Sequence, residues 1–436
     1  MGQNIVRPKG DRPVEKRQAT IGVLTMRILF LSNFYPPVSR GGFEQWCQEV
    51  AEGLVMRGHD VTVLTSDYRR ADVPKADPAW VHRDFHLEME IASLRNAFQF
   101  FTSRKTRENE NLSVLKQHIE QFTPDMILIW GMWNLHRSLP ALAEKLLPGR
   151  VVYYMGDYWP TLPSQFENYW NAPARNPVTG LPKLILKPVA QRILAREERA
   201  TVDFEHVLFP TGFMQKELES KGIKPQNTKV VYGAIDTSPY KNLQHVPDQN
   251  RDLSLLYIGR LTAEKGVHTA IEALGHLQRQ NMGKLKLTIV GDGEPEYEAR
   301  LRQLVKSENV ESLVTFMPAQ PKEKLPALYQ QADIFLFTSI WPEPFGRVIV
   351  EAMASGTTVV GAATGGAAEI MTDNENALLF ASGDAKDLAD QLMKLITSPA
   401  IREKLSKAGR ETAITKFDIQ RMTTGIEDHL QTLTAK

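Results

Sequence analysis

The chain has 436 residues, a length that predicts two or three domains, each large enough to bury its own core. Hydrophobic residues make up 42% and charged residues 24%, which excludes a disordered or fibrous protein. The 52 basic and 51 acidic side chains nearly cancel, which argues against bulk nucleic-acid binding. Cys47 is the single cysteine, so an intrachain disulfide and a cysteine-based zinc cluster are excluded, which fits a reducing cytoplasm.

Residues 1–25 are polar and basic and lack the central apolar block of a secretory signal. We expect a flexible leader there, ahead of a first strand that starts at Met26. No apolar run approaches the 18 residues that suggest a membrane-spanning helix. The sequence therefore predicts a cytoplasmic protein.

From Met26 onward, short apolar runs alternate with helical segments. Residues 26–33 predict a strand, residues 43–57 a helix with one apolar face, and residues 59–66 a second strand. Short links between them are typical of a right-handed βαβ unit in a parallel sheet. Four more strands are expected to start at residues 126, 151, 206 and 229. The region 67–124 is less regular, and we expect it to be helical.

Residues 237–252 are polar, contain two prolines and lack an apolar period, which predicts an interdomain linker. Strands and helices alternate again over 253–416. The predicted fold class is therefore α/β, with two doubly wound, Rossmann-like parallel-sheet domains, 26–236 and 253–416, that face a central cleft. In such folds the ligand binds in the crevice at the carboxyl ends of the strands.

The stretch from Ser339 is the most informative one. A predicted strand runs into a proline-stiffened loop and then into a helix that opens near Gly346. The free amides of Gly346, Arg347 and Val348 and the helix dipole would together form an anion site, with a phosphate as its favoured guest.

Two glutamates bracket this helix start, Glu343 before it and Glu351 inside it. Carboxylates do not bind a phosphate, but they accept hydrogen bonds from hydroxyls on either side of one, such as those of a sugar and a ribose. The alternative is structural: Glu343 caps a helix and Glu351 is a solvated helical residue.

A second stretch, GRLTAEKG, also lies where a strand passes into a helix. Arg260 offers a planar fork for phosphate oxygens and Lys265 a mobile point charge, while Gly259 and Gly266 let the backbone approach closely. An ordinary charged turn is the alternative.

The glycine pair Gly41 and Gly42 precedes the first predicted helix and would allow tight contact with a diphosphate. Such a pair is a weak signal by itself. The strict GxGxxG fingerprint, the phosphate-loop lysine motif and HExxH spacing are absent. A nicotinamide enzyme and a nucleoside-triphosphate hydrolase are therefore disfavoured.

Together these stretches resemble the family 4 glycosyltransferases (glycosyl transferases group 1), which are retaining enzymes of the GT-B fold. EPFGRVIVEAMASG resembles the paired-glutamate signature of the family, and GRLTAEKG its donor-phosphate motif. VYGAIDTSPY is similar to its domain-junction motif and TGGAAEIM to its second glycine-rich turn. Residues 417–436 resemble the closing helix that packs back onto the first domain.

The resemblance implies roles for individual residues. Arg260 and Lys265 would grip the donor diphosphate, which Gly42 would approach from the first domain. Glu343 would hold hydroxyls of the transferred sugar, and Glu351 would hold the ribose. The amides of Phe345 and Gly346 would lie near the sugar.

One departure from the family concerns the predicted acceptor side. The family often has a His-Asp pair where this chain has Gly156 and Asp157. Asp157 and Trp159 remain available to an acceptor, as does Trp133 after another strand. His136 could compensate for the missing imidazole, with a surface histidine as the alternative.

Two segments, 93–107 and 181–196, mix basic and large apolar side chains. Each would suit an interfacial membrane helix, or equally a core helix with one solvated face. We therefore keep a peripheral contact with the inner face of the membrane as an open possibility.

The residues and the resemblance together predict a glycosyltransferase that moves a hexosyl group from a UDP-, GDP- or ADP-sugar to a glycan, lipid-linked or small-molecule acceptor. The resemblance implies that the enzyme is a retaining one. The catalytic residues would be Arg260, Lys265, Glu343 and Asp157. We expect no metal, no cofactor and no nucleic-acid partner. Two alternatives remain open: a non-catalytic sugar-nucleotide-binding subunit on the same fold, and a nucleotide-sugar epimerase.

Overall fold

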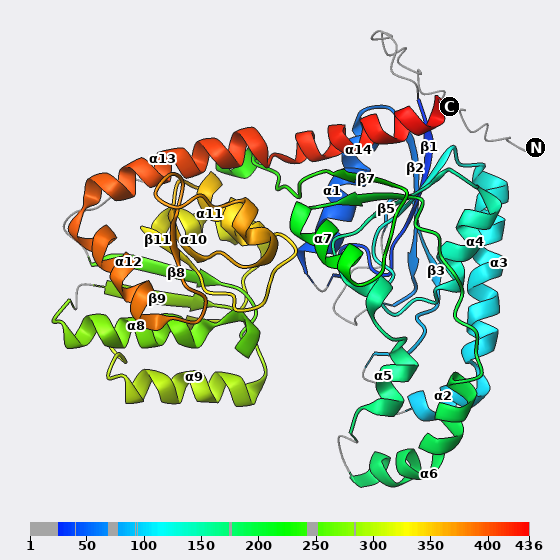
Figure 1. The fold of residues 1–436 in the computed structure, drawn as a ribbon, viewed down its shortest axis with the longest axis horizontal. Helices are drawn as coiled ribbons and strands as arrows, with labels where there is room; N and C mark the ends of the chain where they lie inside the picture. Colours follow the sequence, from blue (N-terminus) through cyan, green and yellow to red (C-terminus); the bar gives the residue numbers. More distant parts are fainter. Residues whose placement is uncertain are drawn as a thin grey trace, which may run out of the picture.

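A computed structural model describes most of the chain: residues 25–39, 41–68, 77–91, 93, 95–173, 177–241, 252–282 and 285–435. The predicted leader, apart from its last residue, and most of the predicted linker lie outside the described residues. The described part forms two lobes (Figure 1), each built on one parallel sheet.

The sheet of the first lobe has seven strands in the order β3-β2-β1-β4-β5-β6-β7. In chain order they are β1 (Arg27–Leu31), β2 (Asp60–Ser66), β3 (Val81–Phe85), β4 (Met126–Ile129), β5 (Val151–Tyr154), β6 (His206–Phe209) and β7 (Asn227–Val230). Ile28 in β1 pairs with Val61 on one side and Met126 on the other. The central strands are almost wholly buried, because helices cover both faces of a parallel sheet.

The helices of the first lobe are α1 (Gly42–Met56), α2 (Asn96–Thr102), α3 (Arg104–Phe122), α4 (Ser138–Leu146), α5 (Gln165–Asn171), α6 (Pro177–Leu194) and α7 (Gly212–Ser220). The expectation that region 67–124 is helical was wrong for β3. This strand is an edge strand whose middle residues are polar and partly exposed, so it lacks the apolar run of the central strands. It pairs with β2, which lies next to it in the sheet.

The sheet of the second lobe has six strands in the order β10-β9-β8-β11-β12-β13. They are β8 (Leu253–Ile258), β9 (Leu285–Val290), β10 (Val314–Met317), β11 (Ile334–Phe337), β12 (Thr358–Ala362) and β13 (Leu378–Phe380). Its helices are α8 (Val267–Arg279), α9 (Pro295–Ser307), α10 (Leu325–Gln331), α11 (Arg347–Ala354), α12 (Ala385–Thr397) and α13 (Pro399–Lys416). Two doubly wound parallel sheets are thus present, as the sequence predicts.

The last helix, α14 (Ile419–Thr434), leaves the second lobe and lies along the first (Figure 1). It packs on α1, where a Cβ on Gly53 would come within 3.1 Å of the Thr423 side chain. Glu427 on α14 forms ion pairs with Arg57 and His59 of the first lobe. The end of the chain therefore ties the two lobes together.

No helix in the described part of the chain has both the length and the apolar character needed to cross a membrane. Pro188 argues against one smooth helix over 181–196, yet α6 continues through it. The proline removes the hydrogen bond to the carbonyl of Leu184. Both residues are exposed, so water can satisfy that carbonyl.

Candidate active site

A cavity of about 290 Å³ lies between the lobes, at the carboxyl ends of strands from both sheets. The first lobe contributes the start of α1 and Gly156 after β5. The second lobe contributes the ends of β8 and β11, the loop that follows β11 and the first turn of α11. The predicted donor-binding residues that line it are Gly42, Arg260, Lys265, Glu343, Phe345, Gly346, Arg347 and Val348. Gly41 and Glu351, which belong to the same prediction, are not among the lining residues.

The turn after β8 and the loop after β11 are joined by hydrogen bonds. Thr338 Oγ1 donates to the carbonyl of Lys265 at 2.8 Å, and the amides of Ile340 and Trp341 donate to that of Glu264. Gly266 has φ +66°, and a Cβ there would lie 2.0 Å from the Thr338 oxygen. Only glycine fits this close approach, so the two stretches that the sequence analysis singled out form one wall.

Charge in the cavity is largely paired. Lys265 Nζ forms an ion pair with Glu343 Oε1, which also accepts a hydrogen bond from Ser339 Oγ at 2.9 Å. Arg260 is exposed, and its Nη2 lies 3.8 Å from Glu264 Oε1. The predicted phosphate ligands and the predicted sugar ligand are therefore neighbours, and Lys265 and Glu343 neutralise each other.

Glu351 is buried one helical turn after Arg347, so it is not the solvated residue of the structural alternative. Its Oε2 accepts a hydrogen bond from the Tyr329 hydroxyl at 3.0 Å. Its Oε1 lies 4.0 Å from Arg347 Nε. Burial and the nearby carboxylate raise the pKa of Tyr329, which keeps its hydroxyl a donor.

The side chain of Arg347 reaches across the cleft, a contact that the sequence analysis missed. Its guanidinium pairs in a two-pronged manner with Glu49 on α1, at 2.9 and 3.0 Å. Burial opposes the charge on Arg347, but Glu49 outweighs it, and the pKa of Arg347 is raised. Lys322 Nζ donates to the same carboxylate at 2.6 Å.

Glu369 makes a second bridge between the lobes. It follows the glycine-rich turn at 365–366, and its carboxylate accepts the amides of Gly212 and Phe213 at the start of α7. Thr211 Oγ1 also donates to the Pro344 carbonyl at 2.8 Å. The cleft is thus closed by polar contacts on both sides of the cavity.

Aromatic rings form the first-lobe wall of the cavity. The Phe43 ring lies between Trp46, Trp130 and Tyr154, with ring centroids 5.7–6.4 Å away. A Cβ on Gly156 would lie 2.4 Å from the Phe43 ring. Phe43 therefore fills the space that a side chain at residue 156 would need, and this accounts for the glycine where the family often has histidine.

Asp157 follows Gly156 in the chain and has an unusual environment. Burial, with a smaller contribution from the nearby Glu44 charge, raises its pKa to about 7. The amide of Trp159 donates to Asp157 Oδ1 at 3.3 Å, which opposes the shift. Asp157 can therefore gain or lose a proton near neutral pH.

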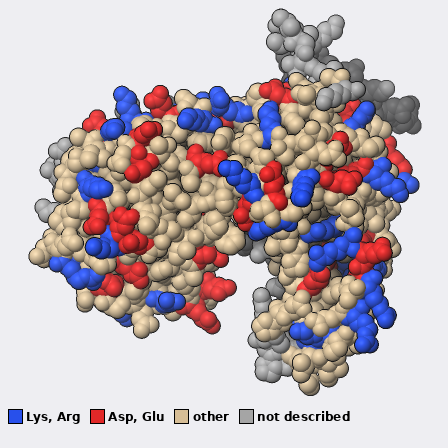
Figure 2. Space-filling model, in the orientation of Figure 1, with Lys and Arg blue, Asp and Glu red and all other residues tan. Residues whose placement is uncertain are grey.

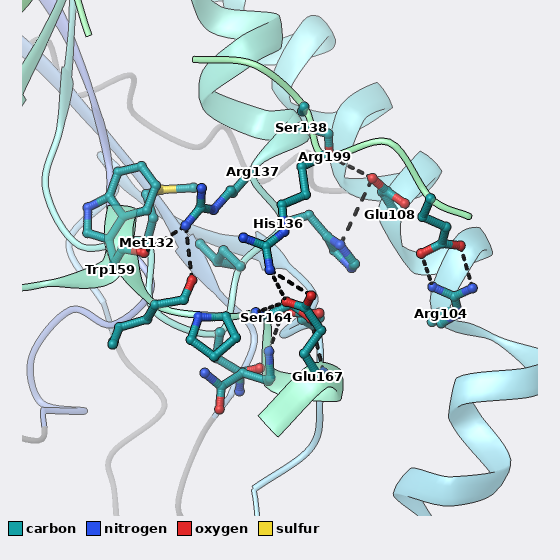
Figure 3. Close-up of a pocket in the computed structure, with 18 of the residues that line it drawn as sticks. Arg104, Glu108, Met132, His136, Arg137, Ser138, Trp159, Ser164, Glu167 and Arg199 are labelled. Carbon is teal, nitrogen blue, oxygen red and sulfur yellow. Dashed lines mark hydrogen bonds and ion pairs between the residues drawn. The ribbon is translucent and has the colours of Figure 1, made fainter. Parts of the chain in front are cut away.

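A second cavity, of about 420 Å³, lies in the first lobe (Figure 3). Three of the four predicted acceptor-side residues line it, namely Trp133, His136 and Trp159, whereas Asp157 does not. Among the described residues, His136 Nε2 and Trp159 Nε1 are buried without a hydrogen-bond partner. The His136 side chain is only 13% exposed, so it is not the surface histidine of the alternative, and its Nδ1 lies 4.0 Å from Glu108 Oε1.

Charged side chains complete the lining of this second cavity. Glu108 lies between His136 and Ser138, and Arg199 pairs with Glu167 (Figure 3). Arg104 pairs with Glu197. The cavity thus offers both donors and acceptors, as a ligand rich in hydroxyls requires.

Two facing α/β lobes, with a glycine-bearing turn and a helix start at their cleft, define the class of GT-B sugar-transferring enzymes. Two family models match the chain: Glycosyltransferase Family 4 over residues 40–239, and Glycosyl transferases group 1 over residues 241–412. Between them they cover most of its length. The chain belongs to this family of glycosyltransferases, which use nucleotide sugars.

Known relatives agree with this assignment. A glycogen synthase of Mycobacterium tuberculosis is 25% identical over 417 residues, covering 92% of this chain and 93% of that one. A mannosylfructose-phosphate synthase of Agrobacterium fabrum is 33% identical over 168 residues, 37% of each chain.

Solved structures show the same fold. A glycosyltransferase of Rickettsia africae has a TM-score of 0.67 at 19% identity and covers 94% of this chain and 98% of its own. HepE of Anabaena, in complex with UDP and glucose, has a TM-score of 0.65 at 22% identity, covering 93% of this chain and 99% of its own.

Proposed function

We propose that this protein is a retaining, metal-independent hexosyltransferase that moves a sugar from a nucleotide-diphosphate donor to a glycan, lipid-linked or small-molecule acceptor. The observation that carries the proposal is the cleft cavity, which gathers Arg260, Lys265, Glu343 and the start of α11. UDP is the best supported donor nucleotide, since HepE, a structural relative, is described in complex with UDP. GDP and ADP remain candidates.

In the proposed reaction the bond between the anomeric carbon and the diphosphate breaks, and negative charge grows on the leaving phosphate. Arg260, Lys265 and the amides at the start of α11 stabilise this charge, as an oxyanion hole does. The family implies that the acceptor hydroxyl attacks from the side on which the diphosphate leaves. A phosphate oxygen of the leaving group then takes the hydroxyl proton.

Donor binding would replace one ion pair by two contacts with the donor, one from Lys265 and one from Glu343. Without a donor, Lys265 and Glu343 hold each other. A bound diphosphate would take Lys265, and hydroxyls of the sugar would then donate to Glu343. In the same proposal the ribose hydroxyl donates to Glu351 Oε1, which faces Arg347 when no donor is bound. Glu351 is buried and does not line the cavity, so this contact requires the Arg347 side chain to move aside.

The second cavity is the proposed acceptor site. In the sequence Asp157 stands between Gly156, which lines the donor cavity, and Trp159, which lines the second cavity, although Asp157 itself lines neither. With a pKa of about 7, Asp157 can accept a hydrogen bond from the acceptor hydroxyl or hold a proton near it. Trp159 would donate its unpaired indole N–H to another acceptor oxygen, and the unpaired His136 Nε2 would donate to or accept from an acceptor hydroxyl.

The test is turnover of UDP-, GDP- and ADP-sugars by the full chain after chelation and desalting. We expect slow hydrolysis of one donor without added metal. A described group with metal-ligand spacing, His82, Asp84 and His118, lines neither cavity. Restoration of turnover only by magnesium or manganese would contradict metal independence.

The other outcomes separate the alternatives. Donor binding without any turnover would favour a non-catalytic subunit, and interconversion of the donor sugar would favour an epimerase. Lys265→Ala should abolish the hydrolysis, whereas Lys324→Ala is the matched control. Lys324 is an exposed lysine of the same lobe and lines neither cavity.

A further inference from the structure

Helix α6 carries an apolar stripe that faces solvent. Leu181, Leu184, Ile185 and Val189 are between 53% and 69% exposed. Their spacing of three, four and eight residues from Leu181 places them on one side of the helix. Four large aliphatic side chains on a single exposed face form a patch rather than scattered surface residues.

The opposite face of α6 is already occupied. Ala190 on α6 belongs to a small core with Phe100 of α2 and with Phe166 and Trp170 of α5. Helix α6 is thus apolar on two sides, and only one of them is covered. The exposed apolar side of α6 is therefore a candidate interaction surface.

Helix α2, which shares this small core, adds two exposed rings, Phe98 and Phe101. Phe98 is 68% exposed. Helices α2, α5 and α6 together form the end of the first lobe that extends away from its sheet (Figure 1). We call the exposed apolar residues of α2 and α6 the α2–α6 surface.

Charge indicates what the partner is. Residues 93–107 and residues 181–196 each contain four basic residues and no acidic residue. At the average of the chain, 51 acids in 436 residues, the two segments together would hold between three and four. Arg192 is exposed and continues the face of Ile185 and Val189, and Arg196 is exposed in the turn just after α6. Basic side chains are also visible at this end of the lobe in Figure 2.

We propose that the α2–α6 surface docks the protein on an anionic lipid bilayer. An apolar stripe that is flanked by arginine and lysine and free of acids is the pattern of a helix lying in the membrane interface. The aliphatic and aromatic side chains enter the acyl boundary, while Arg192 and Arg196 contact lipid phosphates.

Arg104, Lys105 and Arg107 are already held in ion pairs with Glu197, Glu108 and Glu90, so they do not face the lipid as free charges. The positive charge that favours a lipid surface over a protein partner is therefore that of α6 and the turn after it.

Docking would also bring the proposed acceptor cavity to the membrane. Arg104 and Lys105, which follow α2, line the second cavity, as does Leu194 at the end of α6. This step rests on the proposed function, and it favours a lipid-linked acceptor over a free one. The docking itself does not depend on turnover.

The test is flotation of the full chain with vesicles of phosphatidylcholine containing 30% phosphatidylglycerol, compared with phosphatidylcholine alone. We expect binding to the anionic vesicles that weakens as salt is raised. The variant Leu184→Glu/Ile185→Glu should lose at least tenfold in bound fraction. Arg192→Glu/Arg196→Glu should lose the preference for anionic lipid.

Matched controls are Met56→Glu and Ile401→Glu, which change exposed apolar residues on α1 and α13 and should bind as the unchanged protein does. Melting curves confirm that each variant folds. Equal binding by the α6 variants, or no binding by the unchanged protein, would overturn the proposal. So would a dimer that the α6 variants dissociate without any vesicle binding. Vesicle binding by a protein that turns over no donor would leave docking intact and reject the proposed function alone.

Discussion

The two lobes carry their functional residues in different ways. In the second lobe, the cavity residues come from two short stretches of sequence, 257–265 and 336–348. In the first lobe, they are Gly42, Phe43 and Trp46 at the start of α1 and the distant Gly156 after β5, which only the packing of the lobe brings together. A contiguous stretch fixes its own geometry through a strand end, a glycine and a helix start, whereas scattered positions depend on the packing of the whole lobe. The charge chemistry therefore belongs to the second lobe and the shape of the cavity to the first.

The largest expected effect is in the second lobe. If Arg260 and Lys265 stabilise charge that develops as the sugar leaves, Arg260→Ala and Lys265→Ala should each lower kcat by about a hundred- to a thousand-fold. The donor KM should change far less, because in the proposed function the diphosphate would also contact the start of α11. Arg260→Lys should rescue only in part, since an ammonium cannot make the two-pronged contact.

Steady-state kinetics with melting curves measure this prediction. A charged surface turn would give near-normal kinetics, with stability changed by less than about 0.5 kcal/mol. If both variants keep more than about a third of the turnover, the activation free energy has risen by less than about 0.7 kcal/mol. The assignment of charge stabilisation to this turn would then be wrong. The assignment of the charge chemistry to the second lobe would then have no support.

A smaller effect is expected at the shaped wall of the first lobe. Gly156→His restores the residue type common in the family but drives a Cβ into the Phe43 ring, whose aromatic neighbours leave it little room. Overpacking of this kind costs about 1–3 kcal/mol of unfolding free energy. Phe43→Ala should relieve the clash, so the double variant should lose less than the two single losses added.

Denaturant unfolding of the two single variants and the double variant gives the coupling energy. Additive losses would mean that Phe43 and the residue at 156 do not compete for one space. Gly156→Ser is a useful intermediate step, since it adds the same Cβ with little further bulk.

The smallest effect concerns the pH dependence of stability. The folded protein raises the pKa of Asp157 to about 7, so between about pH 4 and pH 7 it holds a proton that the unfolded chain releases. The contribution of Asp157 to the free energy of unfolding is therefore fully present below pH 4 and is lost as the pH rises towards 7. Asp157→Asn, which keeps the acceptor for the Trp159 amide, should gain about 1 kcal/mol on the unchanged protein at pH 8, since water screens part of the charge.

Melting temperatures from pH 4 to pH 8 test this prediction. The difference between Asp157→Asn and the unchanged protein should grow with pH. A constant difference would show that Asp157 titrates as an ordinary surface aspartate, and its assignment to a proton-exchanging role would fail.

Much of the fold follows from the sequence, because the alternation of buried strands and amphipathic helices is a local signal. The edge strand β3 was missed because its middle residues are polar. The sequence did mark the two stretches of the cavity wall, GRLTAEKG and the loop after β11, because each carries its glycines and charges close together. The pairing of Lys265 with Glu343 was not, because the motif gives no distance between them.

The contacts across the cleft could not be predicted. Glu49 and Arg347 are separated by 298 positions, and nothing near Glu49 marks it as the partner of an arginine. Glu369 was noticed only as part of a glycine-rich turn, without its bond to the start of α7. The ring of Phe43 over Gly156 likewise exists only after packing. Gly156 was the one visible signal, as a small residue where the family often has a large one.

The pairing of Lys265 with Glu343 has a consequence for selectivity inside a crowded cell. Inorganic phosphate and free nucleotides are abundant anions, and an unpaired lysine in an open cleft would attract them all. Here an anion can bind Lys265 only if the Glu343 carboxylate loses its ion-pair partner. A bare phosphate has no hydroxyl that could donate to Glu343 as a sugar would, so it does not compensate for that loss. A molecule that joins a diphosphate to a hydroxyl-bearing sugar satisfies both side chains at once. In the proposed function the ion pair would thus act as a filter that favours the intact donor over its own fragments.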